Sequence, residues 1–188
     1  TAGWLDGRIA LWRQTATDEV KLKLGDPDNN SENLGETLRE GIDLQLNAHP
    51  GKNMKIWFSA AYQTSEIVRA AEGSEETQGK EIDHIPHLVY NLGMDYRPSD
   101  KWSFATWINS QSDYYLEDSN TEGQYGGYTL LHATAKYKLN PRITLELQGR
   151  NLTDEYYEYV WYDEWTALQS LHSPGLPRSF YASLNMSF

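Results

Sequence analysis

From Ser179 to the C-terminal Phe188, apolar and polar side chains alternate strictly. The apolar set is Phe180, Ala182, Leu184, Met186 and Phe188, and the polar set is Ser179, Tyr181, Ser183, Asn185 and Ser187. A period of two residues is typical of a β-strand with two unlike faces. The segment is long enough to cross a membrane, although alternation alone favours a half-buried strand of a soluble sheet, because soluble sheets are far more numerous.

The same alternation recurs along most of the chain. It is found in residues 42–46, 54–63, 88–97, 102–111, 131–139 and 143–150, of which 102–111 is the least regular. A first strand is expected somewhere within 5–24. The pattern therefore predicts eight strands and no convincing helix.

The connections between these strands alternate in length. Short turns rich in Pro, Gly, Asn and Asp occur at 49–53, 98–101 and 140–141, and long polar loops at about 25–38, 66–84, 113–127 and 153–177. In an antiparallel meander this order places every long loop at one end. Outer-membrane barrels have this arrangement, with short periplasmic turns and long extracellular loops. We therefore expect an all-β fold, an antiparallel transmembrane β-barrel segment of about eight strands, with a periplasmic C-terminus.

The charged residues also differ between the long-loop end and the short-turn end. The chain has 188 residues and a net charge of −11, yet the four long loops hold 19 acidic and only 2 basic residues. The short-turn side carries Lys52, Lys55, Arg97, Lys101, Lys138 and Arg142. The acidic balance argues against a nucleic-acid partner, and no apolar run is long enough for a transmembrane helix.

Two groups of polar and aromatic residues are candidates for a role in function. Aromatic residues near the long loops predict either an interfacial girdle or a ligand-binding wall. Tyr114, Tyr115, Trp161, Tyr162 and Trp165 are the candidate ligand contacts. Polar residues of the alternating strands are expected to point into a barrel lumen: Asp43, Gln45, Lys55, Gln63, Asp95, Arg97, His132, Lys136, Glu146, Gln148 and Arg150.

Catalytic and metal-binding signatures are missing from the sequence. It contains no Cys, no Gly-x-Ser-x-Gly elbow, no phosphate loop and no His-Glu-x-x-His pair. Residues 25–32 resemble a calcium loop only weakly, because the Gly and Glu that such a loop needs are absent. We expect no enzyme activity, no metal site and no cofactor.

Two ordered motifs near the C-terminus carry a family resemblance. Asn151-Leu152-Thr153-Asp154-Glu155-Tyr156-Tyr157 follows a strand, and Pro174-Gly175-Leu176-Pro177-Arg178 precedes the last one, which ends in Phe188. This order resembles the end of TonB-dependent outer-membrane receptors, such as siderophore receptors. The segments 39–43, 85–87 and 127–129 also match that family, so the resemblance covers about residues 38–188.

The resemblance implies a function in nutrient import. Members of the family have a 22-stranded barrel around an N-terminal plug and take up ferric siderophores or other scarce nutrients with energy from TonB. This chain has no TonB box and no plug, so residues 1–188 are expected to be the C-terminal third of such a barrel. The alternative is an autonomous eight-stranded structural or adhesive barrel.

The resemblance also implies partners and a location. The expected location is the bacterial outer membrane, with lipid and lipopolysaccharide as neighbours and contact with TonB only through the missing N-terminal part. The ligand of the intact receptor would be a ferric siderophore or a similar compound. A last strand ending in Phe resembles the signal read by the barrel-assembly machinery, so Phe180, Tyr181 and Phe188 are the expected assembly signal.

Overall fold

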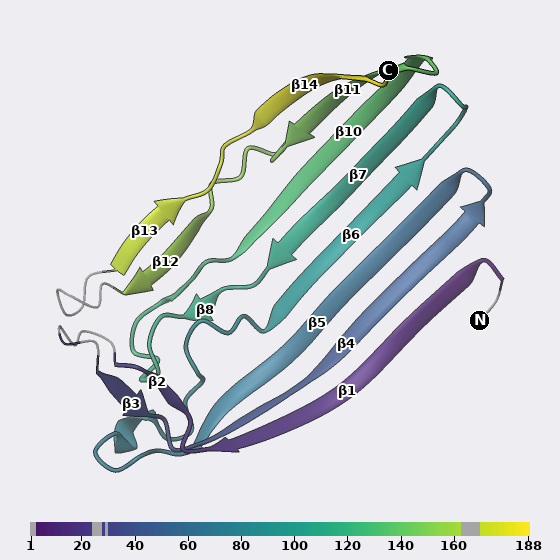
Figure 1. Cartoon of the computed structure of the whole chain (residues 1–188). Helices are drawn as coiled ribbons and strands as arrows, with labels where there is room; N and C mark the ends of the chain where they lie inside the picture. The colour runs from purple at the N-terminus through teal and green to yellow at the C-terminus, as the bar shows by residue number, and fades with distance from the viewer. Residues whose placement is uncertain (1–2, 24–27, 29, 163–169) are drawn as a thin grey trace.

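The computed structural model describes residues 3–23, 28, 30–162 and 170–188. Its main feature is one antiparallel sheet of eight strands in the order β1-β4-β5-β6-β7-β10-β11-β14 (Figure 1). The strands are β1 (Leu5–Thr17), β4 (Glu36–Gly51), β5 (Met54–Arg69), β6 (Leu88–Tyr96), β7 (Trp102–Gln111), β10 (Tyr128–Asn140), β11 (Ile143–Arg150) and β14 (Ser179–Met186). The eight predicted strands are confirmed. β4 and β5 are longer than predicted, since they take in residues 36–38 and 66–69, which were assigned to loops.

The long loops carry secondary structure that the sequence did not predict. Three of them contain a small hairpin, and the fourth a 3₁₀ turn, η1 (Glu75–Thr77). The hairpins are β2 (Val20–Leu22) with β3 (Ser31–Asn33), β8 (Tyr114–Tyr115) with β9 (Gln124–Tyr125), and β12 (Glu158–Tyr162) with β13 (Ser170–Pro174). Strands of two to five residues are too short to give a readable alternation.

The strand register gives the sheet one apolar face and one polar face. A row on the apolar face consists of Leu46, Phe58, Leu92, Ile108 and Leu131. The next row, on the polar face, consists of Asn47, Trp57, Gly93, Trp107 and His132. The residues expected to line a lumen share the polar face, because directly paired residues lie on the same side of a sheet.

The apolar face is open. Leu11 is 75% exposed and Phe180 is 65% exposed. Large uncovered apolar surfaces are rare on soluble monomers, whereas lipid covers such a face in a membrane. Near the short turns this face carries a group of aromatic rings, in which Trp102 lies 5.6 Å from Phe104 and 4.5 Å from Tyr137 between ring centroids.

Most of the buried apolar side chains among the described residues lie in the long loops or at the strand ends beside them. One cluster contains Leu34, Ile67 and Ile82, and the other contains Tyr114, Leu116 and Val160. The long-loop end is therefore the part of the chain that has a core of its own. It lies opposite the short turns and both termini (Figure 1).

The sheet is open at both edges. β1 pairs only with β4 and β14 only with β11, so the two edge strands do not meet within the part of the chain that the structure describes. The autonomous eight-stranded barrel would need these edges to pair, because an unpaired edge in lipid leaves backbone groups unsatisfied. The structure does not favour that alternative. No helix among the described residues is long and apolar enough to cross a membrane.

Candidate functional site

Four charged side chains meet where the loops pack together. The Lys21 ammonium lies 3.3 Å from the Asp83 carboxylate and 3.7 Å from that of Glu32, and it also pairs with Asp118. We call these four residues the Lys21 cluster. Asp118 is buried, and the Lys21 side chain is only 18% exposed. One cation from the β2–β3 hairpin therefore ties together acidic residues from three different loops.

Burial and charge oppose one another in this cluster. Burial alone would lower the pKa of Lys21, but Asp83 and Asp118 outweigh it and hold that pKa above its usual value. Burial and the neighbouring Asp83 charge raise the pKa of Asp118. Burial would also raise the pKa of Asp83, but His84 and Lys21 lower it overall. The charged forms of Lys21 and Asp83 are thus favoured, whereas burial beside Asp83 disfavours the charged form of Asp118.

Backbone hydrogen bonds join the second and third long loops beside this cluster. The backbone N–H of Asp83 donates to the Asp118 carboxylate at 3.0 Å. Asn120 accepts from the Glu81 N–H at 2.7 Å and donates to the Glu81 carbonyl at 3.0 Å. The His84 N–H donates to the Tyr115 carbonyl at 2.8 Å. These two loops therefore pack together as one unit at the long-loop end of the sheet, and we call this unit the loop platform.

The candidate ligand contacts are only partly brought together. Tyr114 is buried against Leu116 and Val160, and its hydroxyl donates to the Val160 carbonyl at 3.4 Å, so its ring packs between loops. Tyr115 is partly exposed next to it. Trp161 and Tyr162 belong to β12, and Trp165 lies outside the described residues. Sequence reasoning missed Lys21, since it lies within 5–24, where the first strand could not be placed more closely.

The two C-terminal motifs contact each other. Asn151 is 2% exposed, and its amide donates to the carbonyls of Glu155 at 2.9 Å and Leu176 at 3.1 Å. Asp154 accepts from the backbone N–H of Arg178 at 3.0 Å and pairs with its guanidinium at 3.3 Å. The first motif therefore clamps the segment that leads into β14.

The expected assembly-signal residues divide between the two faces of β14 and the chain end. Phe180 is on the apolar face and Phe188 is fully exposed. Tyr181 is on the polar face, where the Arg150 guanidinium lies 5.6 Å from its ring centroid. β14 therefore places an aromatic side chain on each face of the sheet.

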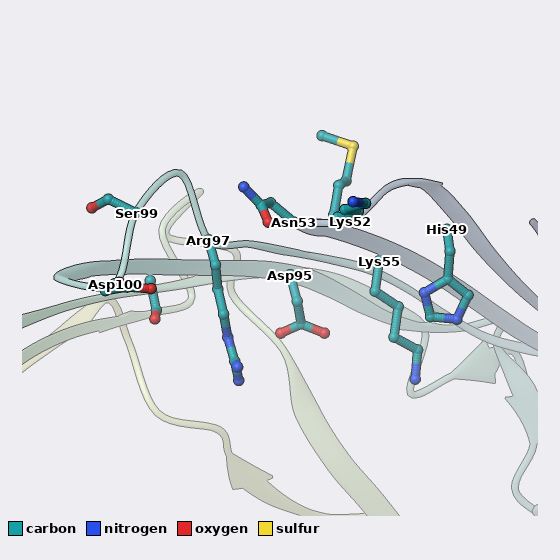
Figure 2. Close-up of a pocket in the computed structure, with 10 residues that line it drawn as sticks. His49, Lys52, Asn53, Lys55, Asp95, Arg97, Ser99 and Asp100 are labelled. Atoms are coloured by element: carbon teal, nitrogen blue, oxygen red, sulfur yellow. The ribbon is translucent and has the colours of Figure 1, made fainter.

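The polar face carries stacked rings and charges. Trp107 stacks on His132 with ring centroids 5.1 Å apart. Lys136 and Glu146 form an ion pair of 3.1 Å. Towards the short turns this face is hollowed between β5 and β6 (Figure 2). No group of three or more His, Asp or Glu residues among those described is arranged to hold a metal ion.

Comparison with known proteins decides the family. A family described as "TonB dependent receptor-like, beta-barrel" matches residues 1–152. The chain belongs to the TonB-dependent receptor β-barrel family. The predicted family is therefore confirmed, and it places the chain in the bacterial outer membrane.

Curated relatives and solved structures agree with this assignment. The metal-pseudopaline receptor CntO of Pseudomonas aeruginosa is 26% identical over 98% of this chain and 26% of its own length. The ferric yersiniabactin uptake receptor FyuA of Yersinia pestis has a TM-score of 0.81 at 14% identity, over 100% of this chain and 28% of that chain. The siderophore receptor PiuA of Acinetobacter baumannii has a TM-score of 0.77 at 18% identity, over 99% and 26%.

These comparisons also show how much of a receptor is present. The chain spans about a quarter of the length of the TonB-dependent receptors that it matches. Since these relatives are receptors rather than enzymes, the prediction that the chain has no enzyme role is confirmed. Its open sheet and two unlike faces are what a section of a larger barrel wall requires.

Proposed function

We propose that residues 1–188 form the C-terminal third of the barrel of a longer receptor, which imports a ferric siderophore or a similar metal chelate with energy from TonB. The observation that carries this proposal is the open eight-stranded sheet with one lipid-type face, all of whose long loops lie at one end. An outer-membrane importer needs such a wall section. The names of the relatives, a metal-pseudopaline receptor and siderophore receptors, support the ligand class.

The proposed orientation follows from the loops. The acidic, packed loop platform would face the outside, and the short turns and the C-terminus would face the periplasm. Tyr115 would then border the entrance from outside, with Tyr114 supporting it from within the loops. We propose Trp161, Tyr162 and Trp165 as further ligand contacts. Outer-membrane lipid and lipopolysaccharide would cover the apolar face, and TonB would act on the part of the receptor outside this chain.

Uptake by the intact receptor tests the proposed function. The full-length receptor containing this chain is expressed in a strain that lacks its own siderophore receptors. Radioactive iron is then supplied as ferric citrate, as a ferric catecholate or as ferric pyoverdine. We expect TonB-dependent uptake of at least one complex, lost when the proton gradient is dissipated. Uptake of none of them, or uptake independent of TonB, would contradict the proposal.

Assembly through the last strand can be measured separately. We propose that Phe180, Tyr181 and Phe188 are read by the barrel-assembly machinery. Phe188→Asp in the intact receptor should lower the amount of folded receptor in the outer membrane by tenfold or more, while the affinity of the remaining receptor for its ligand is unchanged. Ser187→Asp serves as the matched control. Normal insertion of the Phe188→Asp variant would rule out this role.

A further inference from the structure

A groove lies on the apolar face of the sheet, where β7, β10, β11 and β14 are neighbours (Figure 1). It consists of two adjoining hollows of about 320 and 520 Å³, which share Ala135 and Leu147. Each hollow is within the range of ligand-binding pockets, about 300–1,000 Å³. We call the two together the apolar groove, and its floor is made of small residues: Thr106, Ala133, Ala135, Gly149 and Ala182.

The strand register explains why the surface is hollowed at this place. Thr106, Ala133 and Gly149 are directly paired neighbours in one row of the apolar face. Met94 on β6 and Phe180 on β14 continue this row on either side. Because larger side chains lie on both sides of three small ones, the surface dips between β6 and β14.

The apolar groove runs along the strands from the short-turn end. On β7 its lining begins at Trp102 and reaches Thr106, which is about 13 Å at the usual rise of about 3.3 Å per residue. One leaflet contributes half of a bilayer hydrocarbon core that is about 30 Å thick. The apolar groove is therefore about as long as the acyl region of one leaflet, and the proposed orientation places it in the periplasmic leaflet.

The lining of the apolar groove suits a hydrocarbon chain. The Thr106 hydroxyl donates to the His132 carbonyl at 3.0 Å, so this polar group is already satisfied. At the short-turn end the rings of Trp102 and Tyr137, with centroids 4.5 Å apart, form part of the wall. An acyl chain in the apolar groove would therefore contact mainly hydrocarbon and aromatic surface.

Three cationic residues lie at the short-turn end of the same strands. Lys101 precedes β7, Lys138 lies near the end of β10, and Arg142 precedes β11. The Lys138 N–H donates to the Lys101 carbonyl at 2.8 Å, so these two residues lie side by side. All three residues are exposed, and no ion pair or side-chain hydrogen bond within the described ranges involves them. Asp100 is the carboxylate within 98–101 and 138–142, so this end is net positive.

We propose that the apolar groove binds one acyl chain of a glycerophospholipid of the periplasmic leaflet, whose anionic headgroup pairs with Lys101, Lys138 and Arg142. Basic side chains at a membrane surface attract anionic lipid headgroups. An acyl chain and an anionic headgroup therefore match the apolar groove and its cationic end together. This inference rests on the proposed function, in which the short turns face the periplasm. Lipid A also combines phosphate with acyl chains, and the experiment distinguishes it.

Native mass spectrometry of the intact receptor tests this inference. The receptor is purified in a mild detergent, stripped of lipid, and offered equal amounts of phosphatidylglycerol, phosphatidylethanolamine and lipid A. We expect phosphatidylglycerol to be the lipid that is retained first, at least fivefold over each of the others. Retention of all three without preference, or a preference for lipid A, would overturn the inference.

A filled floor tests the place of the acyl chain. Ala135→Leu combined with Ala182→Leu should lower the retention of phosphatidylglycerol at least fivefold, because the added methyl groups occupy the apolar groove. Ala48→Leu is the matched control, since Ala48 is on the same face but lines neither hollow. Equal retention by the filled variant and this control would contradict the assigned place.

Removal of the cations tests the headgroup contact. The combined variant Lys101→Gln, Lys138→Gln and Arg142→Gln should reduce the preference for phosphatidylglycerol over phosphatidylethanolamine to less than twofold. These exposed residues lie at the turns, so the variant is expected to fold. Lys52→Gln, on the β4–β5 turn, is the control and should keep the full preference. A preference that survives in the combined variant would rule out the assigned headgroup contact.

The outcome is independent of the transport assay. If the intact receptor takes up none of the ferric complexes but still retains phosphatidylglycerol through the apolar groove, the ligand assignment fails and the inference stands. If uptake is normal and phosphatidylglycerol is not preferred, the inference fails and the proposed function stands.

Discussion

At the residue scale, the structure gives a physical reason for the C-terminal family motifs. Asn151 has a positive φ of 49°, a conformation that Asn tolerates better than most residues. Its side chain satisfies two carbonyls and one backbone N–H in a buried position. The spacing of the two motifs therefore reflects a contact between Asn151 and the segment before β14.

Replacing Asn151 tests this contact. Asn151→Ala removes the three hydrogen bonds that the buried Asn151 side chain makes to backbone groups of Glu155 and Leu176. At about 1 kcal/mol for each bond, we expect a loss of about 3 kcal/mol in stability. The midpoint of thermal unfolding of the intact receptor in detergent measures it. Asn185→Ala is the matched control, because Asn185 is exposed on β14. Equal midpoints for the two variants would contradict the account.

A second residue-scale feature is the glycine beneath an indole ring. A Cβ at Gly93 would lie 2.2 Å from the Trp57 ring, so only glycine fits there. Gly93→Ala should lower stability by about 1–3 kcal/mol through overpacking. In the Trp57→Ala background the same change should cost far less. A double-mutant cycle with no coupling between positions 57 and 93 would show that the ring does not rest on Gly93.

At the scale of elements, the strands were predictable and the loop hairpins were not. Alternation identified β14, β10 and β11 because each has several residues on both faces. β2 and β8 have three and two residues, so they leave no such signal. The Lys21 cluster could not be predicted from the sequence either, because it joins residues from three loops whose packing depends on long-range contacts. The ring of Tyr114 is buried against Val160, and its role as a ligand contact stays a prediction.

The Lys21 cluster is expected to hold the loops together. Lys21→Met leaves the carboxylates of Asp83 and Asp118 partly buried without their cation, and breaking such a cluster costs about 3–5 kcal/mol. We expect cleavage of residues 70–87 by proteinase K, in outer-membrane vesicles, to become at least tenfold faster. Lys23→Ala, two residues away and exposed, is the control. Equal cleavage rates in both variants would mean that Lys21 does not restrain the loops.

The Lys21 cluster also predicts that the stability of the packed loops depends on pH. The pKa of Lys21 is raised in the folded state, so its contribution is fully present below about 10.5 and is lost as the pH rises through the higher folded pKa. Proteinase K cleavage of residues 70–87 should therefore increase above about pH 10.5. The Lys21→Met variant should lack this step. A step of the same size in both proteins would assign it to other groups.

At the scale of the whole molecule, the described residues form an open sheet rather than a closed barrel, which agrees with the proposed section of a larger barrel wall. The core lies among the loops, the sheet has two open edges, and the apolar face has no protein covering among the described residues. The sequence predicted the eight strands, the two faces and the grouping of the loops. Whether the edges meet could not be predicted, because alternation describes each strand and not its curvature. Ligand contacts were equally inaccessible, since the proposed function assigns part of the binding site to segments outside this chain.

The central claim is that the two faces of the sheet meet lipid and the barrel interior. Since this chain has no Cys, a cysteine introduced at each position from 145 to 148 of β11 can be spin-labelled in the intact receptor in its membrane. The account predicts that labels at Leu145 and Leu147 are accessible to oxygen dissolved in lipid, whereas labels at Glu146 and Gln148 are not. Equal accessibility at all four positions, or the reverse alternation, would contradict it.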